Sequence, residues 1–294
     1  MQCMKFPSWT CKELGRNVHE VNFDFKGKGD MAYILLRSDA HHDNPSSLND
    51  LEEEHLKLAK KRNAPIIDNG DAFCAMQGKW DPRSDKSALK PEHQVDDYLD
   101  ALVSTYAEFL KPYAKQLAVL GTGNHETSVL SRRETNLTER LAERLRVTAG
   151  FKGFCGSYTS WVFIRAKCGK HGTRNTVKLW RTHGQGGGGP VTRGVIQTNR
   201  RAVYVPDANI IVSGHIHQEW TVPIQRVRVS QSGKVYQDEQ MHIQIPSYKD
   251  SYKDSHSYGE WAIERGMPPA PVGAIWLKLS YKKERLVYEI ERAK

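Results

Sequence analysis

The first half of the chain alternates short apolar runs with longer amphipathic segments. The apolar run Met31–Arg37 (MAYILLR) predicts a buried strand, and the spaced apolar residues of Leu48–Arg62 predict an amphipathic helix after it. The same alternation of strand and helix continues through Pro65–Ile67, Glu92–Lys115, Leu117–Leu120 and a helix capped by Asn136 or Thr138. This order predicts an α/β protein whose sheet collects ligands at the carboxyl ends of its strands.

The second half of the chain is mainly strand-like. Strands are expected at Tyr158–Arg165, Val177–Thr182, Ala208–Ser213, Glu219–Val229, Val235–Ile245, Val272–Leu279 and Leu286–Ile290. One helix is expected at Thr192–Arg201, and residues 246–271 are expected to form a long loop. Near the amino end, Val18–Phe25 is expected to add an edge strand.

No segment has the composition of a linker between domains. We therefore expect one domain over residues 1–294, in which residues 1–30 form an amino-terminal extension. Residues 31–217 carry the polar motifs of the strand ends, and residues 218–294 form a mainly β part that contains the loop 246–271.

Polar blocks follow five of the predicted strands. They read Asp39-Ala40-His41, Gly70-Asp71, Gly123-Asn124-His125-Glu126, Thr182-His183-Gly184 and Gly214-His215-Ile216-His217. Alternate residues of an extended chain face the same way, so Asp39 with His41 is expected to aim two donors at one place, as is His215 with His217. A single strand-end histidine is more often a surface or packing residue. Five blocks in one chain are hard to explain as independent accidents, and they predict a metal site.

This order of motifs resembles the calcineurin-like metallophosphoesterase superfamily. The pattern of that family, D-x-H, G-D, G-N-H-[DE], H and G-H-x-H, is present in the same order between Asp39 and His217. The resemblance implies a β-sandwich of two sheets flanked by helices, in four αββα layers. It also implies two divalent metal ions, the first held by Asp39, His41, Asp71 and His217, and the second by Asp71, Asn124, His183 and His215.

The resemblance further implies an enzyme, a phosphoester hydrolase in which a hydroxide held between the two ions attacks phosphorus. In that chemistry His125 protonates the leaving group, a task that suits an imidazole near neutral pH. Mixed oxygen and imidazole donors suit manganese, iron or zinc better than calcium, and the type of ligand does not choose among the three. We expect two manganese ions, with iron or zinc as alternatives.

Two departures from the family pattern narrow the function. Ser38 stands where many members have a glycine before the first aspartate, which changes the turn without removing a ligand. The Gly70-Asp71 block continues as Ala72-Phe73-Cys74 and lacks the Asp-Arg-Gly of the Ser/Thr protein phosphatases. The second departure counts against a protein phosphatase and favours the phosphodiesterase and nuclease branch, or a small-molecule phosphatase.

Charge adds a preference for the substrate. The 294 residues carry a formal net charge of +9, and the stretch from Arg144 to Pro206 holds twelve Lys or Arg residues without one Asp or Glu. Such a stretch can attract phosphate-bearing ligands, although a solvated face is the ordinary explanation of a charge run. We therefore expect a nuclease or phosphodiesterase acting on nucleic acid, with a phosphomonoesterase acting on a phosphoprotein or nucleotide as the alternative. His42 and Arg193 are the candidate substrate contacts.

A protein that keeps the fold for binding alone is the third possibility, and the complete set of expected ligands disfavours it. The five cysteines form no C-x-x-C pair, so we expect incidental thiols with no functional part. No apolar run is typical of a signal peptide or a membrane span, so we expect a cytoplasmic protein without a membrane partner. The oligomeric state is not predicted by the sequence.

Overall fold

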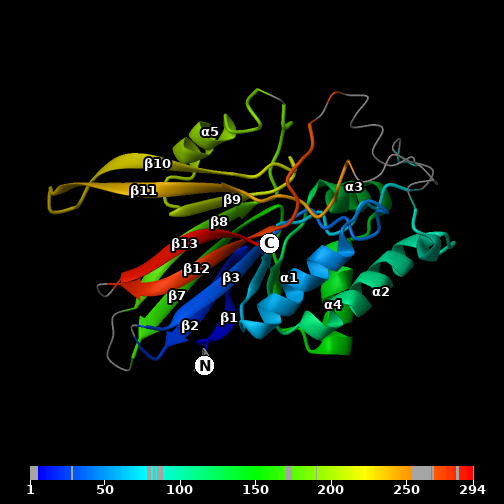
Figure 1. Ribbon diagram of the computed structural model, residues 1–294, viewed down its shortest axis with the longest axis horizontal. Helices are drawn as coiled ribbons and strands as arrows, with labels where there is room; N and C mark the ends of the chain where they lie inside the picture. Colours follow the sequence, from blue (N-terminus) through cyan, green and yellow to red (C-terminus); the bar gives the residue numbers. More distant parts are fainter. Residues whose placement is uncertain are drawn as a thin grey trace.

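The computed structural model describes residues 6–27, 29–77, 81, 84, 89–169, 174–189, 191–252, 266, 268–282 and 285–293. Within these residues the strands form two sheets (Figure 1). The seven-stranded sheet has the order β1 (Ser8–Gly15), β2 (Val18–Phe25), β7 (Thr159–Cys168), β8 (Asn175–Thr182), β9 (Ile210–Ser213), β11 (Val235–Gln244) and β10 (Trp220–Val229). The six-stranded sheet has the order β13 (Arg285–Ala293), β12 (Ala274–Lys282), β3 (Met31–Arg37), β4 (Ile66–Asp68), β5 (Leu117–Leu120) and β6 (Phe154–Cys155).

Strand direction decides where the polar blocks emerge. The strands β3, β4, β5 and β6 run parallel, so their carboxyl ends share one edge of the six-stranded sheet. In the other sheet β8 and β9 run parallel in the same way, with Thr182 opposite Ser213. All five polar blocks therefore leave the two sheets at strand ends.

The helices lie outside the sheets (Figure 1). They are α1 (Asn49–Lys61), α2 (Tyr98–Leu110), α3 (Asn124–Arg133), α4 (Leu137–Ala149) and α5 (Gln197–Tyr204), with two short 3₁₀ turns at Pro91–His93 and Lys111–Tyr113. The buried residues of α1, Glu52, His55, Leu56 and Ala59, have the three- and four-residue spacing of one helix face. Asn136 caps α4 as expected, because its side chain accepts a hydrogen bond from the Glu139 N–H at 3.1 Å.

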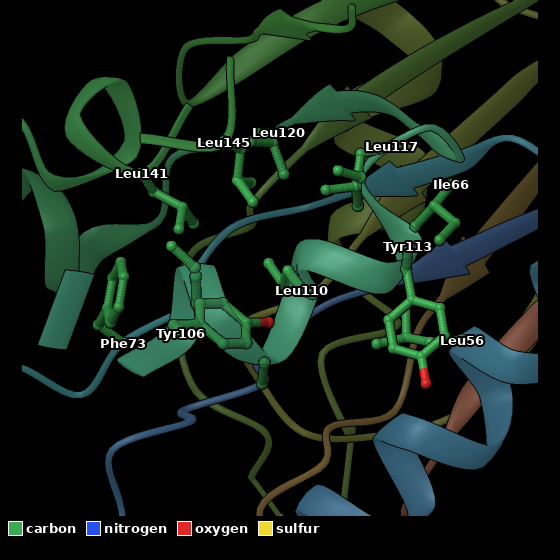
Figure 2. Packing of buried hydrophobic residues seen from close by; sticks show 14 of the residues in the cluster. Leu56, Ile66, Phe73, Tyr106, Leu110, Tyr113, Leu117, Leu120, Leu141 and Leu145 are labelled. Carbon is green, nitrogen blue, oxygen red and sulfur yellow. The ribbon is translucent and has the colours of Figure 1, made fainter. Parts of the chain in front are cut away.

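Apolar side chains fill the space on both faces of each sheet. The layer between the sheets contains Val21 and Phe23 of β2 and Ile34 and Leu36 of β3. A second layer joins the six-stranded sheet to α1, α2 and α4, and Figure 2 shows part of it, with Leu56, Tyr106, Leu110 and Leu141. A smaller cluster of Trp180, Val205, Ala208 and Ile211 lies on the outer face of the seven-stranded sheet, near α5. The expected α/β sandwich of two sheets flanked by helices is thereby confirmed.

Several element boundaries differ from the expectation. Val18–Phe25 is a strand but not an edge strand, because β1 pairs with its outer side. The expected helix Glu92–Lys115 is shorter, since α2 ends at Leu110 and Pro112, which has no N–H to donate, lies in the 3₁₀ turn that follows. The helix expected at Thr192–Arg201 begins only at Gln197, after a turn in which Gly194 has a φ of 77°.

Two further points concern regions without an expected regular structure. The helix α3 was not expected, and it begins at Asn124 inside a polar block. Of the expected loop 246–271, residues 253–265 and 267 lie outside the described residues. Among the described residues, no helix combines the length and the apolar composition that a membrane crossing requires.

Candidate metal centre

The structure brings the five polar blocks together and sorts their side chains into groups. Asp39, His41 and His217 form one group of possible metal ligands, and Asp71, His183 and His215 form another. In each group the donor atoms lie within 4.8 Å of one another. We call these the first cluster and the second cluster.

The first cluster has the spacing of atoms that surround a common ion. The Nε2 atoms of His41 and His217 are 3.3 Å apart, and Asp39 Oδ1 is 3.3 Å from His217 Nε2 and 3.8 Å from His41 Nε2. Donors bound at about 2.1 Å to one tetrahedral ion lie roughly 3.4 Å apart. Asp39 Oδ1 is buried and has no hydrogen-bond partner among the described residues. A carboxylate oxygen in that position fits a cation.

The side-chain amide of Asn124, at the start of α3, lies against the second cluster. Asn124 Oδ1 lies 3.0 Å from His183 Nε2 and 2.7 Å from His215 Nδ1. Asp71 Oδ2 lies 3.1 Å from the same His183 nitrogen. The other ring nitrogen of His183 donates to the backbone carbonyl of Asn69 at 3.0 Å, which orients the ring toward the cluster. Two imidazoles, one carboxylate and one amide oxygen fit a divalent transition metal.

Charge couples the two clusters to each other. Burial alone would lower the pKa of His183, but the Asp71 carboxylate raises it to about 9. Burial raises the pKa of Asp39, yet the nearby imidazoles of His217 and His183 bring it below its ordinary value. Burial holds the pKa of His41 well below its ordinary value. Because an imidazole binds a metal ion in its neutral form, metal binding would release a proton from His183.

The donors converge by another route than the alternation of an extended strand. Asp39, His41, Asp71, His215 and His217 have φ angles of 53°, 44°, 53°, 74° and 52°, all in the left-handed region. The expectation that Asp39 with His41, and His215 with His217, lie on extended chain is therefore wrong. Each pair instead lies in a tight loop just past its strand. Left-handed conformations are uncommon for residues with a side chain and gather at functional sites.

Backbone hydrogen bonds hold the first two loops against each other. The Asp39 N–H donates to the Gly70 carbonyl at 2.9 Å, and the His41 N–H donates to the Asp71 carbonyl at 3.0 Å. The close approach requires glycine at Gly123, because a Cβ there would lie 2.1 Å from Asp71 Oδ1. The His215 N–H donates to Asp39 Oδ2 at 2.9 Å, so the loop after β9 is tied to the loop after β3.

Glu126 connects the loop after β4 to the loop after β5. Its buried carboxyl group accepts hydrogen bonds from the N–H groups of Gly123 at 2.7 Å, Asp71 at 3.1 Å and Phe73 at 3.1 Å. In the sequence, only its place in the Gly123-Asn124-His125-Glu126 block points to Glu126. Three backbone donors on one side chain fix the relative position of the loops after β4 and β5.

His125 lies between the two clusters and is not one of the expected metal ligands. Its ring centroid is 5.0 Å from that of His41, and its Nε2 is 3.8 Å from Asp71 Oδ2. Its Nδ1 lies 2.5 Å from the carbonyl oxygen of Cys74. The ring is 12% exposed, so one edge of it can be reached from outside the protein.

Cys74 lies inside the site, although the cysteines are expected from the sequence to be incidental thiols. Its Sγ is 3.2 Å from His41 Nδ1, and His41, Cys74 and His125 form a third group whose donor atoms lie within 4.8 Å of one another. Burial raises the pKa of the Cys74 thiol to about 12, so the Cys74 side chain is a neutral thiol. The only signal in the sequence was its place three residues after Asp71. Cys11, Cys155 and Cys168 are free thiols outside the site.

The two candidate substrate contacts have different surroundings. His42 is buried, and its ring stacks on that of Tyr106 with the centroids 4.4 Å apart. It is therefore packed rather than exposed. Arg193 is exposed, in the turn between β8 and α5, and its backbone carbonyl accepts a hydrogen bond from Trp220 Nε1 at 2.9 Å.

The acid-free stretch does not form one basic face. Arg181 is fully buried, and its guanidinium donates to Asn69 Oδ1 at 3.0 Å and to the Ser157 carbonyl at 2.9 Å. Arg201 is also buried, and Arg165 is paired with Glu20 of β2. The charge available to a polyanion is smaller than the sequence count suggests.

Comparisons with known proteins give no family. No protein-family model matches the chain, and no curated protein matches it. Vacuolar protein sorting 29 of Cryptosporidium parvum is 13% identical over 89% of this chain and 97% of its own, with a TM-score of 0.32. GAP50, described as the anchor in the inner membrane complex of Plasmodium, is 12% identical over 90% of this chain and 85% of its own, with a TM-score of 0.38. An uncharacterised protein of Streptococcus pneumoniae, described as a predicted phosphoesterase, is 11% identical over 90% of each chain, with a TM-score of 0.31. At TM-scores this low, these likenesses decide neither the family nor the function.

Proposed function

We propose that this protein is a metal-dependent phosphoester hydrolase with a two-metal centre, acting on phosphodiesters of nucleic acid. One observation carries the proposal, which is the pair of donor clusters at neighbouring strand ends with His125 between them. The order of the motifs, which resembles the calcineurin-like metallophosphoesterases, supports the same chemistry.

The residues of the centre fit two divalent cations. Asp39, His41 and His217 would hold the first ion, and Asn124, His183 and His215 would hold the second, with Asp71 shared between them. Such ions, when bound, polarise a phosphoryl oxygen and activate water as a nucleophile at neutral pH. The chain contributes the two buried carboxylates, Asp39 and Asp71, whose negative charge offsets that of the cations.

His125 is the group that would move a proton. The Cys74 carbonyl accepts a hydrogen bond from its Nδ1–H, so the Nε2 edge is the one that faces the space between the clusters. When the ring is protonated, it can donate its Nε2 proton to the oxygen of the leaving group. A proton at this point lowers the barrier most for leaving groups that are poor as free anions.

The preference for a nucleic acid is supported by exposed basic residues on the segment that follows His183 in the chain. Arg193 is exposed in the connection between β8 and α5, which begins at His183. Arg200 is exposed in the first turn of α5. Guanidinium groups can bind successive phosphates of a chain. The block after Asp71 has no arginine that could grip a phosphomonoester, because it reads Ala72-Phe73-Cys74.

The direct test is to titrate the metal-free protein with Mn²⁺ and assay single-stranded DNA, duplex DNA, RNA, a bis-aryl phosphodiester and an aryl phosphomonoester in parallel. The proposal expects Mn²⁺-dependent cleavage of a nucleic acid that weakens as salt rises. Strong preference for the monoester would replace the substrate assignment with the phosphomonoesterase alternative. Absence of metal-dependent hydrolysis on all five substrates would refute the proposed function.

The role of His125 has its own test. We expect His125→Ala to keep both metal ions and to slow hydrolysis of an unactivated diester by about 10² to 10⁴-fold, the usual contribution of a general acid. A p-nitrophenyl diester, whose leaving group needs no proton, should be affected much less. Equal slowing of both substrates would show that His125 does not protonate the leaving group.

A further inference from the structure

Cys74 contacts both histidines that face the space between the clusters. Its sulfur lies 3.2 Å from Nδ1 of His41, and its backbone carbonyl oxygen lies 2.5 Å from Nδ1 of His125. In each imidazole the contacted atom is Nδ1, so Nε2 is the nitrogen left for the site. In His41 this Nε2 is the atom that faces Asp39 and His217.

The tautomer of His41 follows from this contact. A neutral imidazole carries one proton, and it can bind a metal ion through Nε2 only when that proton is on Nδ1. The proton on Nδ1 then needs an acceptor, because the ring is 2% exposed and water does not reach it freely. The Cys74 sulfur is the acceptor at hydrogen-bond distance.

The position of Cys74 is itself fixed by a second buried residue. Asp43 accepts hydrogen bonds from the N–H groups of Cys74 at 2.6 Å and Ala75 at 3.0 Å, and from the Tyr98 hydroxyl at 3.1 Å. The Asn44 side chain donates to the Cys74 sulfur at 3.4 Å. The sulfur and the carbonyl of Cys74 are therefore held in place before any ion or substrate binds.

We propose that Cys74 is a positioning residue of the metal centre, whose sulfur accepts the Nδ1–H of His41 and whose carbonyl accepts the Nδ1–H of His125. The thiol is not a metal ligand in this arrangement. It sets which nitrogen of His41 faces the first cluster, while the backbone sets the same for His125. This inference rests on the proposed function only in taking the first cluster as a metal site.

The variants follow from the two different contacts. Cys74→Ala removes the sulfur and keeps the carbonyl, so it separates the effect on His41 from the effect on His125. Cys74→Ser replaces the sulfur by a hydroxyl that can still accept a hydrogen bond. Cys11→Ala is a matched control, because Cys11 is a partly buried thiol on β1 that donates to the Ala118 carbonyl at 3.6 Å, outside the site.

The first measurement is the affinity of the metal-free protein for Mn²⁺ by calorimetry, with melting temperatures taken on the same samples. Removing a group that orients a ligating histidine typically costs 10- to 100-fold in metal affinity. We expect Cys74→Ala to weaken one of the two Mn²⁺ sites by that factor and to leave the other unchanged. Cys74→Ser should recover part of the loss, and Cys11→Ala should bind as the unmodified protein does.

A second measurement reads the tautomer without any metal or substrate. Long-range ¹H–¹⁵N correlation spectra of the metal-free protein should show the His41 proton on Nδ1, and Cys74→Ala should shift the population toward Nε2. A purely structural role for Cys74 would lower the melting temperature and leave the tautomer ratio as it is, which would overturn the proposal.

Three results distinguish the failure of this inference from that of the proposed function. Cys74→Ala that binds two Mn²⁺ ions like the unmodified protein overturns the inference alone. So does a sulfur-to-metal charge-transfer band on Co²⁺ addition that disappears in Cys74→Ala, since the thiol would then be a ligand. Two-site Mn²⁺ binding that responds to Cys74→Ala but supports no hydrolysis defeats the proposed function and sustains the role of Cys74.

Discussion

Replacing His19 should remove part of the acid sensitivity of the fold. His19 lies on β2, is fully buried, and stacks on Phe154 with the ring centroids 5.7 Å apart. Among the described residues neither of its ring nitrogens has a hydrogen-bond partner. Burial, reinforced by the nearby positive charge of Arg181, lowers its pKa to about 4.

The magnitude follows from the difference between the folded and unfolded pKa values. Below its ordinary pKa of about 6.5 the histidine of the unfolded chain binds a proton, whereas the folded protein keeps the ring neutral down to about pH 4. The stability contributed by the neutral ring is therefore present above pH 6.5 and is lost progressively as the pH falls toward 4. Between pH 8 and pH 5.5 this single group should cost about 1.4 kcal/mol of unfolding free energy.

The assay is urea unfolding of the metal-free protein and of His19→Leu at pH 8 and pH 5.5. Leucine has a similar volume and no titratable group, so its variant should lose about 1.4 kcal/mol less than the unmodified protein between the two pH values. Val21→Ala, a buried change on the same strand, is the control and should destabilise equally at both. Equal pH-dependent losses in the unmodified protein and in His19→Leu would refute the assignment of a buried neutral ring.

Two further outcomes follow from the geometry of the centre. Asp71→Asn removes the negative charge that lies 3.1 Å from His183 Nε2 and should weaken both Mn²⁺ sites in calorimetry, whereas two unchanged affinities would contradict the sharing of Asp71. Gly214→Ala would place a Cβ 1.9 Å from Ser38 Oγ and 2.6 Å from Asp39 Oδ2, so Mn²⁺ affinity at the first cluster and hydrolysis should both fall by at least about tenfold. Gly15→Ala, which meets nothing within 4 Å, is the matched control and should leave both quantities unchanged.

The strands with strong apolar runs could be predicted from the sequence almost to the residue. Met31–Arg37 and Leu117–Leu120 are β3 and β5 as expected, because every side chain of such a run gains from burial in a layered sheet. Strand β1 could not be predicted, since most of Ser8–Gly15 is exposed and its inward alternation is limited to the half-buried Trp9 and Cys11. The alternation of apolar and polar residues reflects which side chains are buried, so an edge strand with few buried side chains shows little alternation.

The start of α3 shows a different limit. Asn124–Arg133 has no strong apolar face, and only Glu126 and Val129 are buried. The Asp71 carboxylate, far away in sequence, accepts the His125 N–H at 3.0 Å in the first turn of the helix. The local signal is Glu126, which accepts the Gly123 N–H at 2.7 Å, and it stands without the apolar periodicity by which a helix is recognised in a sequence.

The sequence also predicted which residues meet at the site better than it predicted the charge around it. The five polar blocks meet because the carboxyl ends of β3, β4 and β5 in one sheet lie close to those of β8 and β9 in the other. The acid-free stretch from Arg144 to Pro206 holds twelve basic residues in the sequence, yet Arg181 and Arg201 among them are buried. A count of charges along the chain does not show which side chains of a strand or a helix point into the protein.

The left-handed loops explain how the site can exist before metal binding. Among the described residues with a side chain, ten have a positive φ, and five of these are Asp39, His41, Asp71, His215 and His217. Each such conformation costs roughly 1–2 kcal/mol. That cost persists only where surrounding contacts dictate the conformation. Here the cross-loop hydrogen bonds from the Asp39, His41 and His215 N–H groups supply those contacts. The strain is therefore met during folding, and cations would encounter donors that need little rearrangement to bind them.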